Sequence, residues 1–235
     1  MLLLATLAVS SAAQAEGTSR AGAERSTACL NRPYSYAGFQ SLARGHGVSA
    51  TVAPIASPSV YDGHVGGWIG VGGPSAGPGG VPQWIQVGLA AFTADKAPRL
   101  YYEVTVAGRS PRYVELAANV RPGTKRRLAV LELPGRKSWW RVWVDGRPVS
   151  PPIRLPGSHG KWYPQAVAEN WNGNTGTCNG YAFRFTDVKV RVAVKHGKKE
   201  RRRWQPFRVG YRFQDAGYRV VKTSRTTSSF VATSL

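Results

Sequence analysis

The chain is divided into short segments in which apolar and polar residues alternate, separated by turns rich in glycine and proline, and it shows no convincing amphipathic helix. Residues 48–54, 101–106 and 181–185 are examples. About a dozen such segments follow one another at spacings of roughly 8–15 residues, which is typical of an all-β domain. Each strand needs a partner surface for its apolar face, so we predict an antiparallel two-sheet β-sandwich.

The chain shows no internal repeat and no break in composition that would separate two folding units, so we predict a single β-sandwich domain over residues 34–235. Residues 2–9 form a short apolar run followed by an A-x-A sequence at 13–15, which predicts a secretion signal peptide over residues 1–15 and an extracellular protein. Residues 16–33 are small and polar and predict a flexible N-terminus. No segment approaches the roughly 20 apolar residues that a membrane-spanning helix needs.

The two cysteines, Cys29 and Cys178, predict one disulfide bond in an exported protein. Two cysteines cannot form a structural zinc site, and the four histidines show no paired spacing, so no metal is predicted. The sequence has no P-loop, and its glycine run at 70–73 is not followed by a helix, so no nucleotide cofactor is predicted either.

The formal net charge is +20, which favours contact with polyanions such as anionic cell-envelope polymers. The densest cationic run, residues 198–203, predicts a basic loop near residues 195–204. That run is either a solvated connection between strands or a contact surface for such polymers. It carries no base-reading module, so no specific nucleic-acid partner is expected.

Two polar residues stand out within predicted strands. Gln86 lies on the same strand face as Trp84 and Gly88, so it is either an amide on a solvated sheet surface or part of a lined cleft. Glu169 lies between small apolar residues and Trp171, where partial desolvation would suit it to acid–base chemistry. The alternative is an exposed carboxylate paired with one of the many basic side chains.

Six short motifs follow one another in a defined order, at residues 34–38, 48–54, 67–73, 85–88, 102–103 and 168–169. In that order they resemble the glutamic peptidases, the eqolisins, over roughly residues 34–192. Among the departures from the family pattern, Gly72 occupies the place of an aspartate in the motif W-x-G-x-D-G.

The resemblance implies a lectin-like (concanavalin A-like) jelly-roll sandwich and an endopeptidase that acts on polypeptides. With the predicted signal peptide, we expect a secreted enzyme, and we expect it to be a monomer. The resemblance also implies a catalytic pair in which Glu169 is the general base and Gln86 donates a hydrogen bond to the developing oxyanion. An alternative function is a non-catalytic sandwich that binds envelope polymers or glycans. The candidate rings for lining the cleft, each of which can equally be core packing, are Trp68, Trp84, Tyr102 and Trp171.

Overall fold

The computed structural model describes residues 33–235 with the exception of 177, 197–198 and 209. Strands account for almost all of its regular secondary structure, and the single helical turn is the 3-10 segment η1 (Pro78–Gly80). Within these residues no helix is both long and apolar enough to cross a membrane. The prediction of an all-β chain is therefore confirmed.

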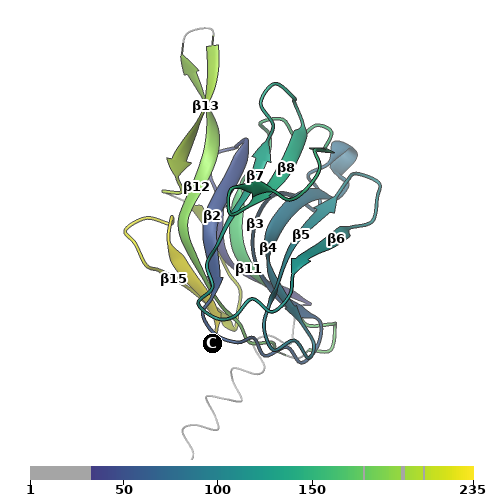
Figure 1. Cartoon of the computed structure of the whole chain (residues 1–235), viewed down its shortest axis with the longest axis vertical. Helices are drawn as coiled ribbons and strands as arrows, with labels where there is room; N and C mark the ends of the chain where they lie inside the picture. The colour runs from purple at the N-terminus through teal and green to yellow at the C-terminus, as the bar shows by residue number, and fades with distance from the viewer. Residues whose placement is uncertain (1–32, 177, 197–198, 209) are drawn as a thin grey trace, which may run out of the picture.

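The strands form two sheets that pack face to face as a sandwich (Figure 1). Every pairing between named strands is antiparallel. The 7-stranded sheet has the order β14 (Gly210–Gln214), β1 (Tyr34–Ser41), β11 (Gln165–Trp171), β3 (His64–Gly73), β4 (Gln83–Phe92), β5 (Arg99–Thr105) and β6 (Arg112–Ala117). The 9-stranded sheet has the order β10 (Ile153–Arg154), β8 (Trp139–Val144), β7 (Arg126–Glu132), β2 (Gly47–Pro54), β12 (Ala182–His196), β16 (Phe230–Ser234) and β15 (Tyr218–Lys222), with β13 (Lys199–Pro206) paired to β12 and β9 (Arg147–Pro148) to β8.

The core lies between the sheets and is built from alternate residues of each strand. In β4, Ile85, Val87 and Leu89 are completely buried, as the period-2 pattern of that strand requires. The residues between them face the outer side of the 7-stranded sheet. This alternation separates a packed inner face from an outer face that is available for a site.

Close packing of the two sheets explains why residue 67, in the glycine-rich strand β3, is a glycine. A Cβ atom at Gly67 would stand 2.5 Å from the ring of Phe183, which projects from β12 and is buried. The glycine therefore lets the ring lie directly against the backbone of β3. Its neighbour Gly66 faces the opposite side of the sheet.

The predicted basic loop near residues 195–204 is wrong. β12 continues beyond its last pair with β2 and forms a two-stranded ribbon with β13, which extends past the rest of the sandwich (Figure 1). The valines of residues 188–194 maintain strand alternation, and the basic run pairs with them. Arg201 and Arg203 are exposed, whereas Arg202 between them turns toward the sandwich.

Candidate functional site

The outer face of the 7-stranded sheet carries a cavity of about 870 Å³. Its walls come from strands that are far apart in the sequence, since β1, β11, β3, β4 and β5 are neighbours in the sheet. We call it the aromatic cavity, because many rings line it: Tyr34, Tyr36, Trp68, Trp84, Phe92, Tyr101, Tyr113 and Phe213.

Glycines make room for the large side chains of this face. Trp68 stands directly opposite Gly88, where a Cβ atom would be 2.5 Å from the Trp68 Cβ. Gln86 stands opposite Gly70 in the same way, with 2.8 Å to the Gln86 Cβ. The glycines of β3 and β4 thus allow a bulky residue on one strand to lie across the neighbouring strand.

Glu169 projects from β11 into the aromatic cavity, and two donors hold its carboxylate. The Trp68 indole nitrogen donates to Oε2 at 3.1 Å, and His64 Nε2 lies 3.1 Å from Oε1. Only 13% of the Glu169 side chain is exposed. The carboxylate is therefore oriented and largely shielded, yet it still faces the cavity.

Gln86 also lines the aromatic cavity. Its Nε2 donates a hydrogen bond to the Tyr101 hydroxyl at 3.1 Å. Burial, reinforced by the negative charges of Glu169 and Glu103, raises the pKa of the Tyr101 phenol well above its usual range. Tyr101 consequently stays protonated and keeps its hydroxyl available as a donor.

The two predicted catalytic residues lie on the two strands that flank β3, Glu169 on β11 and Gln86 on β4. Glu169 is paired with Gly66 and Gln86 with Gly70, so their backbones are four residues out of step, about 13 Å along the strand direction. Their side chains nevertheless line the same cavity. The Tyr101 hydroxyl that accepts from Gln86 lies only 3.8 Å from the position of a Cβ at Gly66. Gly66 thus forms the floor between the amide and the carboxylate.

A second carboxylate enters the aromatic cavity beside the amide. Glu103 is the cross-strand neighbour of Gln86, and its Oε1 accepts a hydrogen bond from the Trp84 indole at 2.8 Å. Burial raises the pKa of Glu103; the Trp84 hydrogen bond opposes this, and the charge of Glu169 adds to it. Reading the sequence alone missed this role, although the position of Glu103 opposite Gln86 follows once β4 and β5 are paired.

The four predicted cleft rings do not share one location. Trp68 and Trp84 line the aromatic cavity. Trp171 stands beside it and packs on two rings of its wall, with centroids 6.2 Å from Tyr34 and 5.5 Å from His64. The prediction for Tyr102 is wrong, because this ring belongs to the core between the sheets.

The face that Tyr102 would have occupied is filled by its neighbour Tyr101. The alternation of β5 places Tyr101 and Glu103 on the outer face and Tyr102 and Val104 in the core. The sequence contains this signal, since a charged residue at 103 assigns its alternate neighbours to the outer side.

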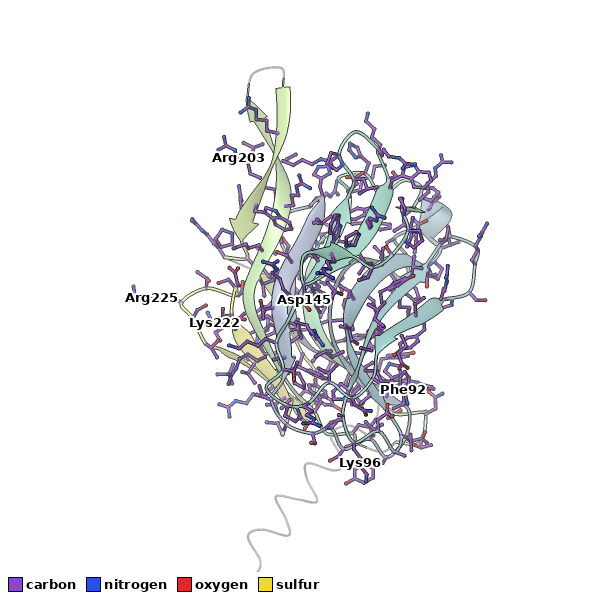
Figure 2. The ribbon with its side chains drawn as sticks, in the orientation of Figure 1. Phe92, Lys96, Asp145, Arg203, Lys222 and Arg225 are labelled. Carbon is purple, nitrogen blue, oxygen red and sulfur yellow. The ribbon has the colours of Figure 1, made fainter. Side chains whose placement is uncertain are left out.

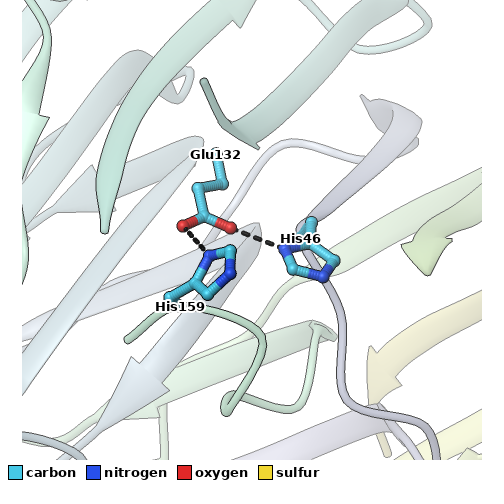
Figure 3. Close-up of side chains that lie close together, drawn as sticks. All are labelled: His46, Glu132 and His159. Atoms are coloured by element: carbon cyan, nitrogen blue, oxygen red, sulfur yellow. Dashed lines mark hydrogen bonds and ion pairs between the residues drawn. The ribbon is translucent and has the colours of Figure 1, made fainter. Parts of the chain in front are cut away.

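One further cluster combines residues that could ligate a metal. His46, Glu132 and His159 place their ligand atoms within 4.8 Å of one another (Figure 3). None of the three lines the aromatic cavity. The spacing of the histidines in the sequence does not predict this cluster, because 113 positions separate the two and only the tertiary fold joins them.

The predicted disulfide involves Cys29, which lies outside the described residues, as do the predicted signal peptide and nearly all of the flexible N-terminus. These features stay predictions.

The sequence matches no protein-family model and no curated protein sequence. Among solved structures, one of scytalido-glutamic peptidase with a transition-state analogue inhibitor resembles the chain with a TM-score of 0.54 and 15% identity, covering 86% of this chain and 98% of that one. A second structure of scytalido-glutamic peptidase, with a peptide-based transition-state analogue, gives a TM-score of 0.53 and 13% identity over the same shares. The chain therefore has a β-sandwich fold like that of the glutamic peptidases.

Proposed function

We propose that the protein is a peptide-bond hydrolase of the glutamic type and that the aromatic cavity is its active site. The observation that carries the proposal is the presence of Glu169 and Gln86 on one cavity of a glutamic peptidase-like fold. The substrate is an extended polypeptide, which fits a cavity whose walls are rings and whose floor is backbone at Gly66.

In this mechanism Glu169 is the general base. It takes a proton from the water that attacks the scissile carbonyl carbon, and it later returns that proton to the leaving amine nitrogen. Trp68 and His64 hold the carboxylate in place through the contacts described above. Because both oxygens already have partners, the carboxylate is oriented before the substrate arrives.

Gln86 supplies the stabilising hydrogen bond. In the free protein its amide donates to Tyr101. A substrate carbonyl above Gly66 would replace that hydroxyl as the acceptor, and the protonated Tyr101 would remain close enough to donate as well. Removing one such donor from an enzyme typically costs about 3 kcal/mol of transition-state stabilisation.

The test is hydrolysis of a denatured protein by the purified chain across pH 2–8. We expect Glu169→Gln to abolish detectable cleavage and Gln86→Ala to lower kcat about 10²–10³-fold. Glu115→Gln is the matched control, since this exposed carboxylate pairs with Arg99 outside the cavity, and it should cleave like the wild type. A wild type that cleaves nothing, or an equally active Glu169→Gln, refutes the proposal.

A second candidate function is non-catalytic binding of envelope polymers, favoured by the many rings of the aromatic cavity and by the exposed cations on the ribbon. Polymers could bind through the rings or, in the electrostatic form of this hypothesis, through the cations. A pull-down on isolated cell walls at low and high salt separates the two, because salt weakens only electrostatic binding. Binding that survives charge reversal at Arg201 and Arg203 excludes the electrostatic form. That the protein is exported is itself a proposal.

A further inference from the structure

A second cavity, of about 540 Å³, lies where the ribbon of β12 and β13 leaves the sandwich. The turn that joins β7 to β8, the loop that precedes β11, and the two ribbon strands form its walls. We call it the basic pocket, because all of its polar lining side chains carry or can accept a positive charge: Arg136, Lys137, His159, Arg191 and Arg202.

A buried carboxylate next to the basic pocket holds two of these side chains in place. Glu132 is completely buried, and its Oε1 lies 2.7 Å from Nδ1 of His159, while its Oε2 lies 2.6 Å from Nδ1 of His46 (Figure 3). Arg202 contributes a guanidinium 3.4 Å from Oε2 and donates to the Glu132 backbone carbonyl at 3.2 Å. The Ser138 amide adds a hydrogen bond of 2.6 Å to Oε1.

This network fixes the charge of Glu132. Burial alone would raise the pKa of its carboxyl, but hydrogen bonds from His46, His159 and Ser138 and the charge of Arg202 outweigh burial and hold the pKa below its usual value. The ionised carboxylate is already saturated with donors. One of its partners is the positively charged Arg202 guanidinium, which would repel a cation, so the site favours a hydrogen-bonded scaffold over a metal site.

The remaining cations of the basic pocket are Arg136, Lys137 and Arg191. Among the ion pairs of the described residues, none joins Arg136, Lys137 or Arg191 to a carboxylate. Arg191 is half-buried, and burial together with repulsion from Arg202 lowers the pKa of its guanidinium. Cations held together in a concave site whose described lining residues include no carboxylate leave an excess of positive charge that an anion would relieve.

We propose that the basic pocket binds a phosphate or sulfate group carried on a small organic molecule. Guanidinium groups present paired N–H donors that match the oxygens of a tetrahedral anion. Arg136 and Arg191 both line the pocket, and the Arg136 guanidinium is stacked over the Trp139 ring at 4.1 Å from its centroid. The pocket has the volume of a small-molecule site, so it has room for more than the anion itself. This inference is independent of peptide hydrolysis in the aromatic cavity.

The test is calorimetric titration of the full-length protein with glucose 6-phosphate, glucose 6-sulfate and glucose at 150 mM salt, where diffuse surface attraction is screened. We expect the two esters to bind saturably with dissociation constants of millimolar or below. We expect glucose itself not to bind. Saturable binding of one ester alone assigns the pocket to phosphate or to sulfate.

Arg191→Gln should weaken binding of the ester about tenfold. Arg203→Gln is the matched control, since it removes the same charge from the same ribbon but on its outer side (Figure 2), and it should change the affinity less than twofold. Arg136→Gln repeats the test at an exposed turn residue, whose guanidinium stacks on the Trp139 ring. Absence of saturable binding by either ester, equal binding of glucose, or equal losses in the Arg203 and the two pocket variants overturns the proposal.

Discussion

Two adjacent glycines of β3 provide a direct test of which face of the sheet carries the site. Gly66 faces the aromatic cavity, and a Cβ atom there would meet its nearest neighbours at 3.6–3.8 Å, an ordinary van der Waals distance. Gly67 faces the core, and a Cβ atom there would meet three ring carbons of Phe183 at 2.5–2.9 Å. The same substitution by alanine should therefore have opposite effects at the two positions.

Gly67→Ala forces a buried ring to move within a packed core, which typically costs 1–3 kcal/mol, so we expect a loss of about 2 kcal/mol in the free energy of unfolding. For a domain of this size that corresponds to a fall of about 4–8 °C in Tm. Gly66→Ala introduces no clash and removes backbone freedom from the unfolded chain, so its stability should equal or exceed that of the wild type by up to about 1 kcal/mol.

Peptide cleavage should respond in the opposite way to stability, with the larger loss at Gly66. The methyl group of Gly66→Ala would stand 3.6 Å from Trp68 Cδ1 and 3.8 Å from the Tyr101 hydroxyl, at the floor where we place the substrate carbonyl. We expect it to lower peptide cleavage strongly, whereas folded Gly67→Ala should retain it. Urea unfolding measures the stabilities, and cleavage of a denatured protein measures the activities. Destabilisation of Gly66→Ala by 2 kcal/mol, or an unchanged Gly67→Ala, would refute the assignment of the two faces.

Three further predictions follow from the carboxylates. Because the folded-state pKa of Glu132 is lowered, its contribution to stability is complete at neutral pH and is lost as the pH falls through that folded pKa. Glu132→Gln should therefore cost about 3–5 kcal/mol in urea unfolding at pH 7 and much less at pH 3, and an equal loss at both pH values would contradict the network. Trp84→Phe removes the donor that opposes the raised pKa of Glu103, so that pKa should rise further in a carboxyl NMR titration. A fall in that pKa would contradict the hydrogen bond between Trp84 and Glu103. Asp187→Asn breaks only an exposed pair with Lys189 and should change the free energy of unfolding by less than about 1 kcal/mol, as a surface control for the Glu132 variant.

Local pattern was sufficient to predict most of the strands, although not β13, and the two faces of β4. The alternation around Gln86 assigned its neighbours Ile85 and Val87 to the core, and both are completely buried. The same rule, applied to β5, would have assigned Tyr101 and not Tyr102 to the aromatic cavity. Tyr102 was wrongly chosen because aromatic residues were selected by type, without applying the two-residue alternation of the strand.

The basic ribbon shows a different failure. A run of like charges suggests a solvated loop, yet Arg202 lies against Glu132, a residue 70 positions away. Charge composition is a local property. The contact depends on the pairing of β13 with β12, which no local pattern specifies.

By itself, the sequence determined the fold class and the inner and outer faces of strands such as β4, because side-chain periodicity is a property of neighbouring residues. Its resemblance to the glutamic peptidases identified Gln86 and Glu169 as the catalytic candidates. Only the tertiary structure decided what those candidates face. It placed Glu103 and Tyr101 beside Gln86, placed Gly66 between the amide and the carboxylate, and gathered His46, Glu132 and His159 into one network. The physical reason is that sheet order and register bring residues from distant segments together, and the residues of one strand do not by themselves specify its partner strand.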